Sequence, residues 1–346
     1  PSTGQWTVVG ALASTRVDHA ATLLADGRVL VVGADDGAGG FVAASDLFDP
    51  ATGMWTRLAG PLYSDPRAVL SLDAFVYAGP ASGALRRFDP TANTWNAAAS
   101  GVPLAVTGGA AALLADGSIV YAGGRTGSPL VDAGASRFVP PATVSALGTA
   151  ASFPPRERAS AVRMPSGAVW VVGGARAGVP TADVRVLMPE PTLDLTATAI
   201  AGLPSGRALD RAVALPDGRW LLVGWEAPSV VHDPATNRWT DVGVGGGPGA
   251  AVVTLAGGKV MTVGGGGVGL GVAPVTSTAL FDPATSSWST LPPVTFPRGL
   301  ATATRLGDGR VLVVGGNLNQ AQAEIYDPET ETWRLVQGPP VAVEGE

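Results

Sequence analysis

Arginine, carboxylate and aromatic residues recur at two places relative to a repeated glycine, although only 14% of the 346 residues are charged. The glycine ends apolar runs such as RVLVVG, which closes at Gly33, and it returns every 40 to 51 residues. One place lies 17 residues before the glycine, and the other lies directly after it. Guanidinium groups form paired hydrogen bonds with carboxylates, phosphates and sulfates, and carboxylates accept hydrogens from sugars and ammonium groups. These places and their neighbours therefore predict a site for a small polar or anionic ligand, built from Arg16, Asp65, Arg125, Arg156, Arg158, Arg207, Trp225, Arg298 and Asn317.

Four residues near the same places indicate a second kind of chemistry. A carboxylate or an imidazole close to an arginine can move a proton while the arginine stabilises a developing anion. The alternative function is thus a metal-free acid–base enzyme, of the isomerase or cyclising lyase type, with the candidate catalytic residues His19, Glu157, Asp210 and Glu226. A further alternative is that these groups pair with one another at the rim of a solvated channel, and that His19 is structural.

The composition excludes several classes of protein. The chain has no cysteine, which removes disulfides, thiolate nucleophiles and cysteine-bound metal centres, and we expect no cofactor and no metal. A net charge of −6 argues against nucleic acid as a partner, because phosphate backbones require clustered Lys and Arg. The apolar stretch 252–275 carries Lys259 and fits the repeat described below, so we do not expect a membrane span. We expect a monomer; the compartment stays open, with a secreted or extracellular location preferred to the cytoplasm.

Two phrases recur in step along the chain and indicate a repeat built from strands. The first is DGRVLVVG (26–33), and the second is DPATGMW (49–55), which returns as DPTANTW, DPATNRW, DPATSSW and DPETETW. Seven copies of the glycine at this period are typical of a repeat architecture. Each copy predicts four strands, which in the first copy are HAATLL (19–24), RVLVV (28–32), SDLF (45–48) and an outer strand beginning at Trp55.

The residues between these strands predict the turns. Asp26-Gly27 is expected to close a tight hairpin through a primed turn, because glycine tolerates positive φ. The Asp of each Asp-Pro can accept a hydrogen bond from the N–H two residues on, and the Pro fixes φ, so that the third strand ends there. The tryptophan that follows is expected to cover the seam against the next copy.

The glycine pair after the second strand, the later Asp-Pro and the tryptophan resemble the kelch repeat. The resemblance covers residues 1–337 and implies an all-β fold, a seven-bladed β-propeller with four antiparallel strands per blade, like the central domain of galactose oxidase. The copper-radical chemistry of galactose oxidase is not expected, since it needs a cysteine-linked tyrosine and two histidine ligands. We predict a single domain over 1–346, with a closing strand at 1–10 that docks on the last blade, a tail at 338–346, and repeats at 11–60, 61–101, 102–149, 150–201, 202–243, 244–293 and 294–337.

Copies three and four depart from the pattern. Ala146 and Asp194 stand where other copies have the outer tryptophan. Their outer strands are expected to form an unlike sector of the rim, through drift or as a surface for a protein partner. The sequence therefore leaves three functions open: a binder of a small polar molecule, glycan or peptide, an acid–base enzyme, and an interaction scaffold that acts through blades three and four.

Overall fold

A computed structural model describes residues 12, 19–33, 42–60, 68–72, 75–79, 84–100, 110–114, 116–126, 131–132, 135–140, 143–147, 153–164, 167–187, 197–199, 202–207, 211–224, 227–266, 271–316 and 322–336. Every regular element within these ranges is a β-strand, which confirms the all-β prediction for this part of the chain. The same ranges contain no helix long and apolar enough to cross a membrane.

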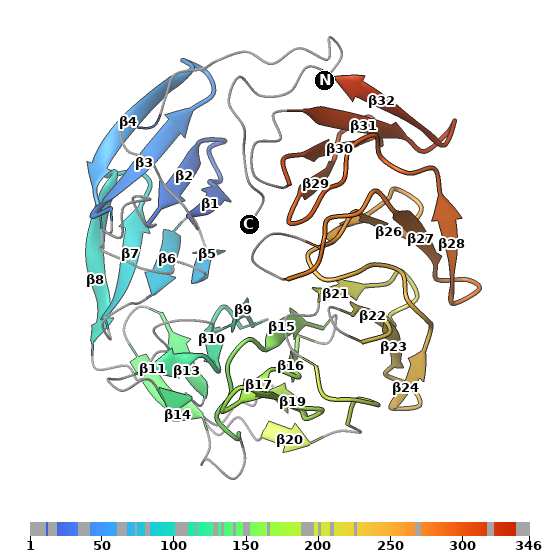
Figure 1. Cartoon of the computed structure of the whole chain (residues 1–346). Coiled ribbons are helices and arrows are strands. Elements are labelled where there is room, and N and C mark those ends of the chain that lie inside the picture. Colours follow the sequence, from blue (N-terminus) through green and yellow to red (C-terminus); the bar gives the residue numbers. More distant parts are fainter. Residues whose placement is uncertain are drawn as a thin grey trace. The chain divides into compact units, whose positions relative to one another are not determined.

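The chain divides into two compact units, of which the first is Val9–Ala208 and the second is Pro1–Val8 with Leu209–Glu346. The described part of the first unit has four sheets of four antiparallel strands, each in chain order (Figure 1). Sheet 1 contains β1 (Ala20–Leu23), β2 (Val29–Val32), β3 (Ala44–Asp49) and β4 (Met54–Ala59). Sheet 2 contains β5 (Ala68–Leu72), β6 (Phe75–Gly79), β7 (Ala84–Asp89) and β8 (Thr94–Ser100).

Sheets 3 and 4 complete the first unit, and each carries a small extra hairpin between its second and third strands. Sheet 3 contains β9 (Ala110–Leu113), β10 (Ile119–Ala122), β13 (Ala135–Val139) and β14 (Thr143–Leu147), with the hairpin β11 (Arg125–Thr126) and β12 (Val131–Asp132). Sheet 4 contains β15 (Ser160–Arg163), β16 (Val169–Val172), β19 (Val184–Leu187) and β20 (Ala197–Ala199), with the hairpin β17 (Ala175–Arg176) and β18 (Val179–Pro180). Asp194 lies outside the described residues, so the partner surface predicted at these outer strands stays a prediction.

The described part of the second unit has three sheets of the same design. Sheet 5 contains β21 (Arg211–Ala214), β22 (Trp220–Val223), β23 (Val230–Asp233) and β24 (Arg238–Asp241). Sheet 6 contains β25 (Ala251–Thr254), β26 (Val260–Val263), β27 (Thr278–Asp282) and β28 (Ser287–Leu291). Sheet 7 contains β29 (Thr302–Arg305), β30 (Val311–Val314), β31 (Ala323–Asp327) and β32 (Thr332–Val336).

The core of each unit lies between successive sheets. First strands are neighbours, since β5 lies beside β1 and β9, and β9 lies beside β15; in the second unit β25 lies beside β29. Leu47 of sheet 1 packs in one cluster with Phe88 of sheet 2, and Met261 of sheet 6 packs in one cluster with Val313 of sheet 7. Every copy therefore folds into the four strands predicted from the sequence. Closure into one seven-bladed ring and the single domain over 1–346 stay predictions, and the closing strand 1–10 and the tail 338–346 lie outside the described residues.

The hairpin between the first and second strands has a different turn from the one predicted. Gly27 N–H donates to the Leu24 carbonyl at 3.0 Å and Leu24 N–H donates to the Arg28 carbonyl at 2.8 Å, and within the loop only Gly27 has a positive φ, of 88°. This is a three-residue loop, a type I turn followed by a left-handed glycine, and not a two-residue primed turn. The Asp26 carboxylate favours it by accepting the Arg28 N–H at 3.0 Å.

The Asp-Pro turn between the third and fourth strands has the predicted hydrogen bond. The Oδ1 atom of Asp49 accepts the N–H of Ala51 at 2.9 Å, and Asp327 accepts the N–H of Glu329 at 2.9 Å. The turn then passes through one residue of positive φ before the outer strand, which is Gly53, Asn93, Asn237, Ser286 or Glu331. The recurrent phrase is therefore a turn motif, as predicted.

The tryptophan of the outer strand covers the seam against the preceding sheet, which corrects the prediction that it faces the next one. Trp95 of sheet 2 donates its indole N–H to the Ser45 hydroxyl of sheet 1 at 2.9 Å. Trp333 of sheet 7 donates to the Pro292 carbonyl, which follows sheet 6, at 2.9 Å. The chain reaches the outer strand last, and that strand turns its large ring back towards the sheet already in place.

One arginine explains why the two phrases occur in step. Arg28 donates to the Asp26 carboxylate of its own hairpin and, across the seam, to the Pro90 carbonyl at 2.6 Å and the Asn93 side-chain carbonyl at 2.8 Å. Arg219 repeats the contact from sheet 5 to sheet 6, on the Pro283 carbonyl and the Ser286 hydroxyl. The Asp-Gly-Arg hairpin of one sheet thus holds the Asp-Pro turn of the next.

Candidate functional site

The two predicted places lie against each other wherever the structure describes both. Gly124 N–H, after the second strand of sheet 3, donates to the Arg156 carbonyl at 2.5 Å. Gly174 N–H donates to the Arg207 carbonyl at 2.8 Å, and Gly265 N–H donates to the Arg298 carbonyl at 2.7 Å. The loop that enters a first strand and the loop that leaves the preceding sheet's second strand therefore share one end of these sheets.

The repeated glycine is required by this close approach. A Cβ atom at Gly123 would lie 2.5 Å from the Arg156 carbonyl oxygen, and a Cβ at Gly264 would lie 2.0 Å from that of Arg298. Both glycines also have positive φ, of 71° and 68°, which side chains disfavour. The glycine that marks the repeat in the sequence is therefore where two successive sheets meet.

Arg298 is completely buried, with no exposed surface on the side chain or on that of its partner Glu324. Its Nε and Nη2 atoms donate to Glu324 Oε1 at 3.2 and 3.0 Å. Its Nη1 atom donates to the carbonyls of Gly315 at 2.6 Å and Gln322 at 3.1 Å. The guanidinium group thus ties together the loop that joins the second and third strands of sheet 7.

Arg156 occupies the same position in sheet 4 and is also fully buried. It donates to the carbonyls of Gly173 and Asp183 at 3.1 Å each, pairs with the Asp183 carboxylate, and lies over the Phe153 ring at 5.1 Å. Burial lowers the pKa of Arg156, and the charges of Arg185 and Arg176 act in the same direction. Burial alone would raise the pKa of Asp183, but hydrogen bonds from Arg185 and Arg156 outweigh it and lower that pKa.

The placement of these arginines does not support the prediction that they contact a ligand. Arg156 and Arg298 are 0% exposed and Arg207 is 3% exposed. A guanidinium group that is enclosed and already bound to carbonyls and a carboxylate has no accessible face for an anion. Their regular spacing in the sequence reflects a structural role, since each one closes the same loop of its sheet.

Arg158 and Arg176 of sheet 4 are in the opposite situation. Both side chains are exposed, and neither has a hydrogen-bond or ion-pair partner among the described residues. They flank a backbone bridge between Glu157 and Ala175. Four arginines (Arg156, Arg158, Arg176, Arg185) here face two carboxylates (Glu157, Asp183), so this loop pair carries an excess of positive charge. Arg158 was predicted as a ligand-binding residue, whereas Arg176 was noted in the sequence only as one of several charged residues after the glycine.

Arg158 also has strained backbone geometry. Its φ is 54°, in the left-handed region. The equivalent residues of sheets 6 and 7 are Gly249 and Leu300, with φ of 71° and 59°, so the loop itself imposes this conformation. Glycine would relieve the strain, which amounts to roughly 1 kcal/mol for an ordinary side chain. An exposed arginine is held here at a cost in stability.

The remaining predicted residues are only partly described. Glu157 is half-buried and exchanges backbone hydrogen bonds with Ala175, at 2.8 and 2.7 Å. His19 is half-buried at the start of sheet 1, and Arg125 begins β11, where only its backbone is described. The other members of the two predicted sets lie outside the described residues, and their roles stay predictions: Arg16, Asp65, Asp210, Trp225, Glu226 and Asn317.

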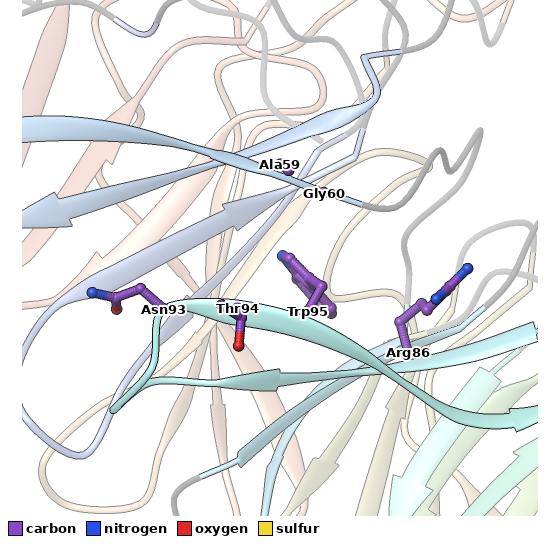
Figure 2. A pocket seen from close by; sticks show the side chains of 6 residues that line it. All are labelled: Ala59, Gly60, Arg86, Asn93, Thr94 and Trp95. Carbon is purple, nitrogen blue, oxygen red and sulfur yellow. The ribbon is translucent and has the colours of Figure 1, made fainter.

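A groove on the first unit was not foreseen from the sequence (Figure 2). It lies between the end of β4 and strands β7 and β8, and its volume is about 360 Å³. Its lining combines an indole, a guanidinium group, an amide and a hydroxyl with a stretch of bare backbone, and the residues are Ala59, Gly60, Arg86, Asn93, Thr94 and Trp95. The sequence gave no signal for it because it depends on the register of two strands.

No group of three His, Cys, Asp or Glu side chains suited to a metal ion occurs in the described ranges. The residues also do not fit the copper centre that a galactose-oxidase-like fold implies. The sequence has no cysteine, and His232 is fully buried, with its ring centroid 4.6 Å from that of Trp239.

Comparisons with known proteins show the fold alone. No protein-family model matches the chain, and no curated protein sequence matches it. Among solved structures, the chain is similar to a novel fungal alcohol oxidase of the AA5 family in complex with copper, with 18% identity and a TM-score of 0.60. The similarity covers 95% of this chain, which spans 66% of the length of that structure. The chain therefore has an all-β, propeller-type fold that is distantly related to the galactose-oxidase-like fold.

Proposed function

We propose that the seven sheets close one kelch-like β-propeller and that the loops of sheet 4 bind a small anionic ligand. The observation that carries the proposal is the pair of exposed, unpartnered arginines Arg158 and Arg176, next to arginines that are buried and paired. The ligand class is a carboxylate, phosphate or sulfate, as a free small molecule or on a glycan or peptide.

The electrostatics of the loop pair favour this ligand class. Asp183 is occupied by Arg156 and Arg185, so it does not neutralise the two exposed arginines. Guanidinium groups are weakly hydrated and bind oxyanions through two parallel hydrogen bonds, which makes two of them a suitable pair for one anion. The strained backbone of Arg158 supports a functional reading, because strain of this kind is retained where the side chain is needed.

The test is a titration with inorganic sulfate and with malonate at low ionic strength, followed by NMR signals of the arginine Nε–H groups. The variants Arg158→Gln and Arg176→Gln are each expected to weaken binding roughly tenfold or more, because each removes charge-assisted hydrogen bonds. Arg163→Gln is the matched control, since Arg163 is an exposed arginine of the same sheet on β15. Equal binding by all three variants and the unmodified chain would rule out this site.

A further inference from the structure

We propose that the groove between sheets 1 and 2 is a second binding site and that it takes a single acidic sugar ring of the uronate type. The proposal goes beyond the anion site on sheet 4 and does not depend on it. Figure 2 shows Trp95 and Arg86 rising from sheet 2 towards the Ala59–Gly60 end of β4, with Asn93 and Thr94 farther along the groove.

Arg86 is exposed at a position that other sheets bury. It pairs with Ala78 on the second strand, in the register that places Asp46 opposite Val31 and Glu324 opposite Val313. Asp46 and Glu324 are 1% and 0% exposed, and the equivalent Ser136 and Val230 are 3% and 1% exposed. Arg86 has no hydrogen-bond or ion-pair partner in the described part of the chain.

A β-bulge accounts for this difference. The ladder between β7 and β8 shifts register between Leu85 and Arg86, where Leu85 pairs with Ala99 and Arg86 pairs with Ala97. The described ladders between third and fourth strands of the other sheets run without a shift. Bulges redirect individual side chains and are frequent at binding sites. Here the bulge lies at Arg86, the residue that gives the groove its positive charge.

The remaining lining residues are held in place before any ligand arrives. Trp95 is fixed by its hydrogen bond to the buried Ser45 hydroxyl and by packing on Phe88, with ring centroids 5.3 Å apart. Asn93 is fixed by the hydrogen bond from Arg28. Such pre-organisation reduces the entropy lost on binding.

The chemistry of the lining selects the ligand. An indole ring packs on the C–H face of a sugar, amide and hydroxyl groups bond sugar hydroxyls, and a free guanidinium group pairs with a carboxylate. A volume of about 360 Å³ is at the lower end for small-molecule sites and suits one ring better than a chain. A sugar ring that carries a carboxylate uses all three kinds of contact.

The experiment titrates the intact chain with glucuronate, with glucose and with acetate, and follows the Trp95 indole N–H by NMR. Trp95→Phe assigns that signal among the nine tryptophans. Glucuronate is expected to bind with a Kd of the order of 1 mM, and glucose and acetate at least roughly tenfold more weakly, because each lacks one part of the contact set. Arg86→Gln should lower glucuronate affinity roughly tenfold or more and leave glucose binding unchanged.

Two outcomes would overturn the proposal. One is glucuronate binding no tighter than glucose or acetate, and the other is Arg86→Gln binding glucuronate as well as the unmodified chain does. Arg163→Gln in sheet 4 is the control for the change in net charge. Arg86 is exposed, so its replacement should not unfold the chain, and the other tryptophan signals report that directly.

Discussion

At the scale of single residues, most of the repeated side chains are explained by turns and seams. The left-handed position before the outer strand is an example, because it is occupied by Gly53 in sheet 1 and by Glu331 in sheet 7, with φ of 69° and 54°. The same backbone conformation is thus made by residues of very different tolerance for it.

Glu331→Gly is expected to raise the free energy of unfolding by about 0.5–1 kcal/mol, because glycine removes the strain of a left-handed side chain and loses part of that gain to the entropy of the unfolded chain. Urea unfolding measures the change. Glu329→Gly is the control in the same turn, at a residue of ordinary φ, and should lose stability. A loss in both variants would contradict the reading of the turn.

His232 connects stability to pH. It is fully buried where Phe48, Phe88 and Phe281 stand in other sheets, and burial lowers its pKa below 6.5 despite a contact with Asn237. The folded state therefore binds the proton less readily than the unfolded chain does. The neutral imidazole keeps its full stability above pH 6.5, and stability falls as the pH drops from there towards the folded-state pKa.

His232→Phe is expected to remove this slope and to keep the packing on Trp239. Urea unfolding at about pH 5.5 and about pH 7.5 provides the comparison, because the unperturbed pKa of histidine lies between these values. The carboxyl groups with lowered pKa, such as Asp26 and Asp183, titrate below 3.8 and do not contribute in this window. An equal slope in the variant would mean that His232 is not the group responsible.

At the scale of elements, the buried arginines join the loops of each sheet. Arg298→Met leaves the Glu324 carboxylate buried without its partner and is expected to cost about 3–5 kcal/mol of unfolding free energy. Adding Glu324→Leu should recover most of that loss, since the unpaired charge is then removed too. Arg158→Gln, at an exposed arginine, should change stability by about 0.5 kcal/mol or less. A small effect of Arg298→Met would contradict the structural role.

The sequence was a good guide to elements and a poor guide to the site. Strand positions followed from apolar runs and turn residues, because burial and backbone chemistry act locally. The ligand-binding role of Arg156 and Arg298 was inferred from their spacing, but spacing does not distinguish an arginine that faces solvent from one that caps a loop. The carboxylates that pair with them, Asp183 and Glu324, lie 27 and 26 residues away along the chain. The groove at Arg86 depends on a register shift, which leaves no mark on the pattern of residue types.

At the scale of the whole molecule, the repeated contacts between successive sheets carry the proposal of a closed ring. Each described glycine contact and each Asp-Gly-Arg contact joins one sheet to the next in the chain. A repeat of this kind leaves its first and last sheets with unpaired surfaces unless they meet each other, and closure removes them.

A crystal structure of the chain grown with inorganic sulfate tests this account most directly. We expect seven four-stranded sheets in one closed ring, with a sulfate ion held between Arg158 and Arg176 of sheet 4. An open arrangement, a different number of sheets, or a sulfate-free Arg158–Arg176 pair with the ion bound elsewhere would contradict it.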